Sequence, residues 1–313
     1  MAIFFLLIFY TQGELLVHFI DVGQGEAILI QTPNAKNILI DGGTKKYGPS
    51  LVKYLSDLKI KDIDLIIATH PHEDHIGGLL AVFDNLAVKN VCYPAKAHTS
   101  VTFEQFINKV NQSGAKRIKA VKGKIFSLDP DIELVILSPF EGTNYDSLNH
   151  YSVVTKLTYG SINVLFTGDC EIENEKMLLE DQVNLQADVL NVAHHGSSTS
   201  SSAEFLRAVS PLVAIISVGK DNPYQHPHQD VLNRLKEHNI AIYRTDLQGN
   251  IILKSDGKCI YILNQEGYLE ILDTNLKQDT DEKYQQEYYR YLFDQDKKAI
   301  LHKEGIEYIQ PNL

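Results

Sequence analysis

The chain has 313 residues, 44% of them hydrophobic and 22% charged, so it can bury one sizeable core and carry an appendage. Its formal net charge of -11 argues against a surface that coats nucleic acid generally, although a local basic groove or bound divalent cations could still receive a phosphate. The three cysteines, Cys92, Cys170 and Cys259, are far apart and odd in number, which excludes a disulfide framework and predicts buried thiols.

Residues 1–13 form an apolar N-terminal segment. Its hydrophobic run covers about ten residues, well short of the roughly twenty that cross a bilayer as a helix, so we expect no membrane-spanning domain. No Lys or Arg precedes Lys36, so the positively charged start of a signal peptide is missing. An export signal, the stub of a membrane segment and a simple apolar terminus all stay open; the first two predict an exported or membrane-associated protein, the third a cytoplasmic one.

The following residues begin a domain predicted over residues 14–264. Short apolar or β-branched runs, separated by turns that contain Gly or Pro, predict strands at 15–20, 26–31 and 37–40. Apolar residues then recur at helical spacing from Gly48. An almost wholly apolar run over 63–68 predicts a strand that ends at a His-rich segment.

Helical and extended patterns alternate through the rest of this domain. Helices are predicted at 76–86, 102–113, 171–180, 203–209 and 228–238. Strands are predicted at 132–137, 152–159, 162–167, 187–193, 212–218, 240–243 and 250–254. This mixed succession indicates an α/β protein whose sheets are covered by helices.

Residues 265–313 differ in composition and form an acidic, Tyr-rich C-terminal extension. The stretch from Glu282 to Phe293 is compatible with a helix. We expect the extension to pack a short helix on the core. Contact with a protein partner and partial mobility are the alternatives.

Residues 69–78 hold the strongest chemical signal in the chain. Three imidazoles and two carboxylates fall within six positions, and so many ligand types in one turn are typical of a metal site. His70 and His72 can point to the same side and share one cation, while Asp74 and His75 can face a second position beside it. Nitrogen and oxygen donors without thiolates leave room for water, which favours hydrolysis over a structural role.

Two later strands also end in candidate ligands. The apolar run over 162–166 leads to Asp169, and the run over 189–193 leads to His194 and His195. Asp169 alone could be a turn or helix-cap residue, but its position after a buried strand favours a ligand.

Together these motifs are similar to the ordered motifs of the metallo-β-lactamase superfamily. Over about residues 15–256 the chain more narrowly resembles the hydrolase domain of the ComEC family of DNA-uptake proteins. The segments that carry the resemblance are Asp21 to Ala27, Ile40 to Gly43, His75 to Gly78, Asn149 to Ser152, Leu165 to Asp169, His194 to Ser197 and Arg244 to Asp246. ComEC also carries a large membrane channel, and none is expected in these 313 residues, so the resemblance implies the chemistry and not DNA uptake itself.

The resemblance implies an αββα four-layer sandwich with a site for two divalent ions, zinc or manganese, between the inner strand edges. In that arrangement His70 and His72 would bind the first ion. Asp74 and His75 would bind the second, and Asp169 would bridge the two.

Two positions in this ligand set stay open. His195 is the preferred last ligand of the second ion and His194 would touch substrate, but the sequence does not decide which of the pair binds metal. Many superfamily members place a further His on the first ion, where this chain has Asn149 and His150. His150 is a candidate ligand, with a position filled by water or substrate as the alternative. Asn149 is expected to contact substrate.

Four other residues have candidate supporting roles. Asp41, which follows a strand, would orient a His or a loop behind the ligands. Ser197 could donate to a phosphate oxygen or begin a helix. His226 lies in a turn-rich loop and could protonate or bind substrate, with a capping or surface role as the alternative. Glu26 stands where ComEC relatives usually have Asp, and we expect it to support its loop.

Two divalent ions held in this way would lower the pKa of a shared water and give hydroxide at neutral pH, so no serine or cysteine nucleophile is required. The groups expected nearest the reaction are Asp74, Asp169, His194 and His226. The first functional hypothesis is hydrolysis of phosphodiesters, with DNA as one substrate. The second is hydrolysis of a smaller ester, such as a phosphorylcholine diester, a lactone or a β-lactam, which a narrow apolar pocket would favour. The third is a metal-binding interaction module whose C-terminal extension engages a protein partner.

Overall fold

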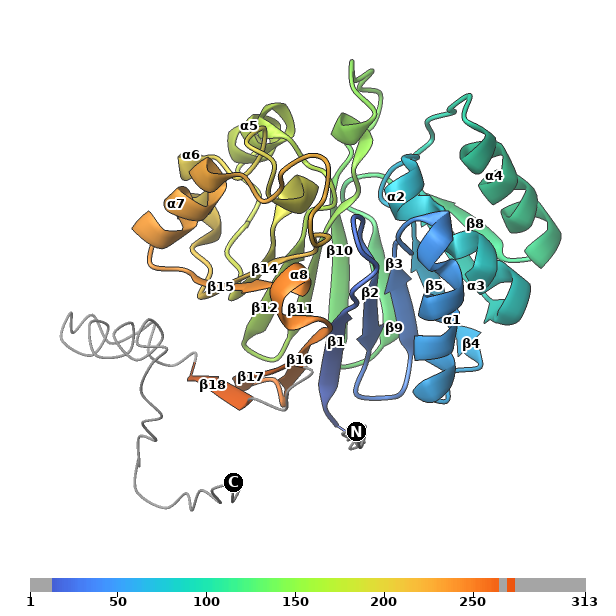
Figure 1. Ribbon diagram of the computed structural model, residues 1–313, viewed down its shortest axis with the longest axis horizontal. Helices are drawn as coiled ribbons and strands as arrows, with labels where there is room; N and C mark the ends of the chain where they lie inside the picture. The colour runs from blue at the N-terminus through green and yellow to red at the C-terminus, as the bar shows by residue number, and fades with distance from the viewer. Residues whose placement is uncertain (1–12, 265–268, 274–313) are drawn as a thin grey trace. The chain divides into compact units, whose positions relative to one another are not determined.

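Two β-sheets pack face to face, and helices cover both outer faces (Figure 1). The computed structural model describes residues 13–264 and 269–273. The first sheet has nine strands in the order β18-β17-β16-β1-β2-β3-β5-β7-β8, and the second has seven in the order β15-β14-β13-β12-β11-β10-β9. The predicted α/β four-layer sandwich is therefore confirmed.

The strands of the first sheet are β1 (Leu15–Phe19), β2 (Ile28–Gln31), β3 (Asn37–Ile40), β5 (Leu65–Ile67), β7 (Asn90–Tyr93), β8 (Lys116–Lys119), β16 (Ile251–Ser255), β17 (Cys259–Asn264) and β18 (Leu269–Asp273). Those of the second are β9 (Ile125–Asp129), β10 (Ile132–Ser138), β11 (Val154–Tyr159), β12 (Ile162–Phe166), β13 (Val189–Asn191), β14 (Val213–Ile216) and β15 (Ala241–Arg244). The short strands β4 (Asp62–Ile63) and β6 (Ala87–Val88) pair with each other.

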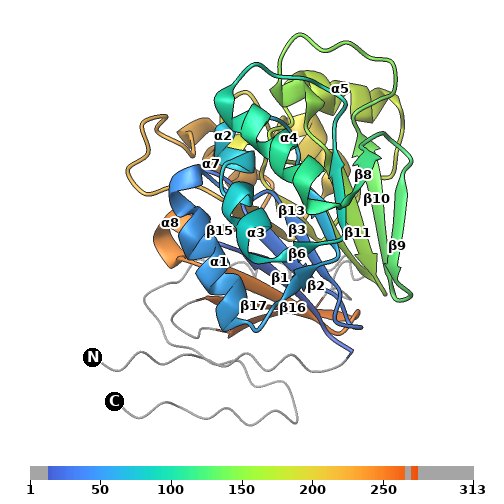
Figure 2. The same ribbon diagram turned by 90° about the vertical axis from the view of Figure 1, so that its right-hand side faces the viewer.

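The helices are α1 (Gly48–Asp57), α2 (Glu73–Ile76), α3 (Leu79–Asn85), α4 (Val101–Ser113), α5 (Ile172–Glu180), α6 (Ala203–Val209), α7 (Gln229–Glu237) and α8 (Thr245–Gln248). Three short 3-10 turns are η1 (Lys45–Tyr47), η2 (Asn149–Tyr151) and η3 (Ala193–Gly196). Helices α1, α3 and α4 pack on the first sheet and lie in front of its strands in Figure 2. Helices α5, α6 and α7 pack on the second sheet.

The core between the sheets follows from the alternation of side chains along each strand. Leu29 and Leu39 belong to the cluster under the helices of the first sheet, so their neighbours Ile28 and Ile40 face the second sheet. Phe19 of β1 and Phe166 of β12 are both fully buried, and their ring centroids lie 6.4 Å apart. This aromatic contact joins the two sheets.

Parallel pairing places the candidate ligands at one edge of the sandwich. Strands β3, β5, β7 and β8 run parallel to one another in the first sheet, as do β12 to β15 in the second. His70 and His72 follow the carboxyl end of β5, and Asp169 follows that of β12. His194 and His195 follow β13, which pairs with β12. Ligands of α/β proteins commonly collect beyond the carboxyl ends of such strands.

The helix predicted at 76–86 is in fact two helices, α2 and α3, which part at Gly77 and Gly78. A Cβ at Gly78 would overlap the carbonyl oxygen of Gly42, and one at Gly77 would lie 2.5 Å from the Lys45 nitrogen. The Gly78 nitrogen donates to the Gly43 oxygen at 2.8 Å. The two glycines thus let the loop after β3 approach the backbone, and this contact outweighs the continuous helical pattern.

The described residues include only a small part of the predicted N-terminal segment and C-terminal extension. Strand β18 lies within the predicted extension at 265–313, pairs antiparallel with β17 and forms one edge of the first sheet. The predicted helix from Glu282 to Phe293 and all of the apolar N-terminal segment except Gly13 lie outside the described residues. Within the described part of the chain, none of the helices has the length and apolar character needed to cross a bilayer.

The cysteine prediction holds for two of the three thiols. Cys92 and Cys170 are buried, whereas Cys259 is partly exposed.

Replacement of Phe19 by Ala should lower the free energy of unfolding by about 3–5 kcal/mol, because it leaves a cavity between the sheets. Urea unfolding followed by circular dichroism measures this loss. The matched control is Leu247→Ala, whose side chain is 71% exposed and should change stability by no more than about 0.5 kcal/mol. Equal losses in the two variants would contradict the assigned core.

Candidate metal centre

Local backbone geometry turns the candidate ligands toward one point. His72 is extended directly before α2, which places Asp74 and His75 in the first turn of that helix. His194 and His195 both have left-handed backbones, with φ of 53° and 55°. Such angles cost a non-glycine residue about 1–3 kcal/mol, so the surrounding fold must hold them.

Asp169 lies at the centre of the cluster, and its two carboxylate oxygens face different imidazoles. Oδ1 lies 3.1 Å from His75 Nε2 and 3.8 Å from His195 Nε2. Oδ2 lies 3.5 Å from His70 Nε2 and 3.7 Å from His194 Nε2. A carboxylate in this position can serve two cations at once.

Each side of Asp169 has a further donor. On the first side, which is that of Asp169 Oδ2, His70 Nε2 lies 3.0 Å from His72 Nδ1. On the second side, which is that of Asp169 Oδ1, His195 Nε2 lies 3.4 Å from Asp74 Oδ2. The atoms of Asp74, His75 and His195 that can bind a metal all lie within 4.8 Å of one another.

The cluster has buried polar atoms that nothing in the described chain satisfies. His75 Nε2, His195 Nε2 and Asp169 Oδ1 are buried and make no hydrogen bond, although the first and last are only 3.1 Å apart. Buried polar groups without a partner are rare and unfavourable. Three such atoms facing one point fit a divalent cation, and the nitrogen and oxygen donors suit zinc or manganese.

Electrostatics also favour a cation. Burial opposes charge on Asp169, but His75, His70 and His195 hold the pKa of this carboxyl well below its usual value. Burial likewise opposes charge on His75, but Asp169 and Asp41 raise the pKa of its imidazole well above the ordinary value. The buried carboxylates therefore attract positive charge, which a divalent ion supplies without a proton.

Two hydrogen bonds determine which ring nitrogen of His75 and of His195 faces the cluster. His75 Nδ1 lies 2.6 Å from Asp41 Oδ2, and Asp41 also accepts from the Thr69 nitrogen at 2.8 Å. His195 Nδ1 lies 2.9 Å from the carbonyl oxygen of Ser217, which can only accept, so Nδ1 carries the hydrogen. Both rings then present Nε2 to the cluster. Asp41 thus contacts the ring of His75, and its predicted role in orienting a ligand stays a prediction.

His194 is held in a similar way by Glu171. Its Nδ1 lies 3.3 Å from Glu171 Oε1 and 3.2 Å from Thr199 Oγ1. Nε2 therefore faces Asp169 on the same side as His70. The structure brings both His194 and His195 into the cluster, one on each side of the carboxylate.

His150 lies outside the cluster. Its Nε2 is 3.3 Å from Glu171 Oε2 and 3.6 Å from Glu173 Oε2, so acidic groups of the segment before and within α5 hold the ring. Its neighbour Asn149 does reach the cluster, with Nδ2 3.4 Å from His194 Nε2. His150 was a candidate for a further donor beside His70. In the structure His194 lies in that position instead.

A cleft of about 290 Å³ opens over the cluster. The residues that line it are Gln24, His72, Glu73, Asp74, Asp169, His194, His195, Tyr224 and His226. His226 lies on its wall, with a ring centroid 5.7 Å from that of His194. Burial, together with His195 and His194, lowers the pKa of His226 to about 4, so the ring is neutral at pH 7.

Ser197 is buried, contacts Thr199 at 3.1 Å and is not among the described residues that line the cleft.

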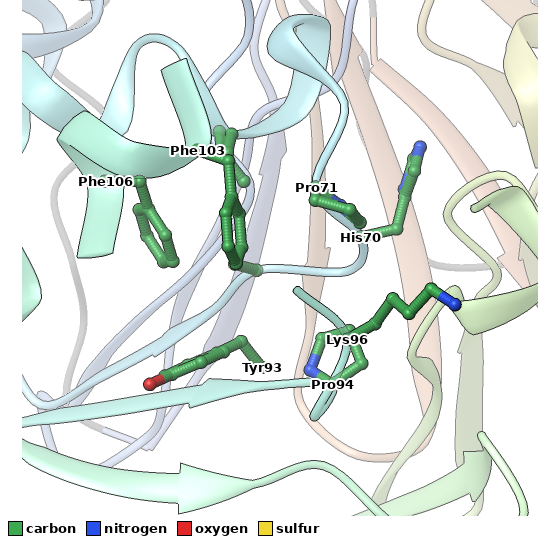
Figure 3. Close-up of a pocket in the computed structure, with 9 residues that line it drawn as sticks. His70, Pro71, Tyr93, Pro94, Lys96, Phe103 and Phe106 are labelled. Atoms are coloured by element: carbon green, nitrogen blue, oxygen red, sulfur yellow. The ribbon is translucent and has the colours of Figure 1, made fainter. Parts of the chain in front are cut away.

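A second hollow, which shares none of the residues that line this cleft, lies beside His70 (Figure 3). Its walls include Phe103 and Phe106 of α4 and Tyr93 at the end of β7. It measures only about 10 Å³, about the least space that one water molecule needs. It therefore serves as apolar packing behind His70 and not as a substrate pocket.

Sequence patterns missed several residues of the centre. Thr69 begins the His-rich segment and Glu171 follows Asp169 by two positions, so proximity to the motifs was the one available signal. Glu26, which we expected to support its loop, is buried; its Oε2 accepts from Asn191 at 2.8 Å, and burial raises the pKa of its carboxyl to about 7. Tyr224 has no spacing pattern that marks it as part of the cleft.

Comparison with known proteins agrees with this fold and donor set. The family model of the metallo-beta-lactamase superfamily matches residues 20–220, and the chain belongs to this superfamily. It is thus a metal-dependent hydrolase whose clustered His and Asp side chains can bind metal.

The relatives include a ComE operon protein and a competence protein, which confirms the predicted resemblance to ComEC. The chain is 33% identical over 271 residues to ComE operon protein 3 of Bacillus subtilis, covering 80% of this chain and 34% of that protein. It is 32% identical over 240 residues to competence protein ComA of Neisseria gonorrhoeae, covering 76% of this chain and 32% of that protein. The chain thus spans about a third of the length of these relatives.

A solved structure confirms the fold at low sequence similarity. CmlA, a diiron β-hydroxylase from Streptomyces venezuelae, matches with a TM-score of 0.52 at 16% identity. The match covers 78% of this chain and 55% of that chain. A related fold is thus compatible with more than one metal chemistry.

Asp169→Asn should remove bound metal from both sides of the cluster, because it removes the one carboxylate that the two sides share. Metal per chain, measured by mass spectrometry after dialysis against zinc or manganese, should fall toward zero. His150→Ala should keep the wild-type content, since its ring faces Glu171 and Glu173. Full retention of metal by the Asp169 variant would refute the assignment.

Asp41→Asn should weaken metal binding about 10- to 100-fold, the usual loss when the hydrogen-bond partner of a ligating His is removed. Competition with a chromogenic chelator measures the affinity. Asp64→Asn is the control, because Asp64 is also buried and accepts from a backbone nitrogen at 2.9 Å, but it bonds Asn37 and Lys89 instead of a ligand. Equal affinities in the two variants would contradict the role of Asp41.

Proposed function

We propose that the chain hydrolyses phosphodiester bonds of nucleic acids with two divalent ions, zinc or manganese. The observation that carries the proposal is the buried carboxylate of Asp169, whose oxygens face two separate groups of imidazoles. Sites with two metal ions are common among enzymes that cleave phosphate esters.

Divalent ions bound on the two sides of Asp169 would supply an activated water and stabilise the charge that develops on the phosphate. The protein contributes the geometry. Asp41 and the Ser217 carbonyl keep Nε2 of His75 and His195 directed inward. His226 offers a neutral ring on the cleft wall, where it can bind a substrate oxygen through an N–H.

The cleft favours a charged substrate over a small apolar ester. Most of the described residues that line it are His, Asp, Glu or Gln. A narrow apolar pocket would support a lactone or β-lactam, and the apolar hollow beside His70 is too small to hold either. One relative is named competence protein ComA, and another, from Haemophilus influenzae, is named recombination protein 2. These names point toward nucleic acid.

The net charge of -11 makes nucleic acid binding depend on the metals. Without cations, Glu73, Asp74 and Asp169 would repel a phosphate from the cleft. Binding and hydrolysis should therefore be lost together when a chelator removes the ions.

Purified protein loaded with manganese or zinc should hydrolyse a chromogenic phosphodiester and DNA faster than a lactone or a chromogenic β-lactam. His72→Ala should lower the rate by at least about 100-fold, because even residues that only support metal ligands are worth 10- to 100-fold. Leu247→Ala, prepared in parallel, should keep the wild-type rate, whereas a contaminating nuclease would leave DNA hydrolysis unchanged in the His72→Ala preparation. Turnover of only the lactone or the β-lactam would overturn the proposed substrate class.

A further inference from the structure

Tyr224 is an exposed aromatic side chain on the wall of the metal cleft. Large hydrophobic side chains that remain exposed in the described residues are Val101, Ile125, Tyr224 and Leu247. Tyr224 is 60% exposed and is the one of these four that lines the cleft with Asp74 and Asp169. An exposed ring at a binding cleft is available to a ligand.

The loop that carries Tyr224 joins β14 to α7 (Figure 1) and is internally braced by Asn222. Asn222 Oδ1 accepts from the backbone nitrogens of Tyr224 at 3.2 Å and His226 at 3.0 Å. Its Nδ2 donates to the carbonyl oxygens of Gly219 at 2.9 Å and His226 at 2.6 Å. One side chain thus holds both ends of the turn on which the ring is mounted.

The same loop is attached to the metal centre at both of its ends. The Gly219 nitrogen donates to Gln24 Oε1 at 3.2 Å, and Gln24 also lines the cleft. At the other end, the His228 nitrogen donates to the oxygen of Gly196, which directly follows His195. The loop is therefore fixed relative to the ligands, and an aromatic platform held in advance costs little entropy when a ligand binds.

One face of the Tyr224 ring is already covered. Tyr224 stacks on His226 with ring centroids 5.7 Å apart and an interplanar angle of 26°. His226 in turn lies 5.7 Å from His194, so a row of rings leads from the cluster to the cleft rim. The exposed area of Tyr224 leaves room for one more planar group at the outer end of this row.

We propose that Tyr224 is the stacking platform for an unpaired nucleobase next to the phosphodiester that is cleaved. This inference rests on the proposed function and adds the form of the substrate. Aromatic side chains stack on any base, because every base has a flat π face. In a duplex both faces are covered by neighbouring bases, so a protein reaches them only in single strands or splayed ends. The platform therefore selects single-stranded nucleic acid.

The test compares Tyr224→Ala and Tyr224→Phe on short single-stranded oligonucleotides, with Leu247→Ala as a control for loss of an exposed hydrophobic side chain. Tyr224→Ala should raise KM about 5- to 150-fold, the value of one stacked base, with little change in kcat. Tyr224→Phe keeps the ring and should keep the wild-type KM. Wild type should prefer single strands to duplex, and Tyr224→Ala should reduce that preference.

An abasic substrate separates stacking from a general structural effect. Removing the base beside the cleaved bond should raise the wild-type KM by the same factor, and Tyr224→Ala should then cause no further loss. Equal KM values for wild type and Tyr224→Ala on the intact single strand would overturn the inference. So would an equal loss in Tyr224→Ala on the abasic strand.

A binding measurement keeps this result separate from the proposed function. Single strands that carry one fluorescent base analogue should lose emission on binding to the metal-loaded wild type, and the loss should disappear in Tyr224→Ala. If DNA binds with this loss but is not cleaved, the proposed function fails and the platform stands. If DNA is cleaved but the emission does not respond to Tyr224, the platform is wrong and the proposed function stands.

Discussion

The buried carboxylate of Asp169 is the constraint on which the rest of the centre depends. A charged group that is only 2% exposed is stable only where opposite charge or hydrogen bonds surround it. His70 and His194 meet one oxygen, and His75 and His195 meet the other. The positions of four imidazoles are thus tied to a single side chain at the end of β12.

The packing of the two sheets controls the spacing within that centre. His70 and His72 follow a strand of the first sheet, whereas Asp169 and the His194 pair follow strands of the second. Contact between the inner faces, such as that of Phe19 with Phe166, therefore sets how far the two ligand groups stand apart. A shift of one sheet against the other would change metal geometry without altering any ligand.

The sequence predicted the parts of this arrangement that depend on local spacing. The candidate ligands of residues 70–75 share one turn, and Asp169 and the His194 pair follow apolar runs that read as strands, so each group could be placed at the end of a strand before the fold was known. The break between α2 and α3 could not be predicted, because it depends on Gly78 meeting Gly42 from a distant segment. The direction of the His150 ring toward Glu171 is likewise a tertiary contact.

Prediction from the sequence was also weak for the outer strands of the first sheet and for surface loops. Strands β8 and β17 lack a strong alternating pattern, and β18 lies in a segment whose composition suggested an extension. Tyr224 belongs to no motif, and only the bracing of its loop brings it to the cleft. These features follow from contacts between remote residues, which one sequence does not reveal.

The left-handed backbones of His194 and His195 have a consequence for stability. Glycine adopts such angles without strain, so a glycine at either position would relieve backbone strain and remove an imidazole from the cluster in the same step. At these two positions the stability of the fold and the completeness of the donor set therefore oppose each other.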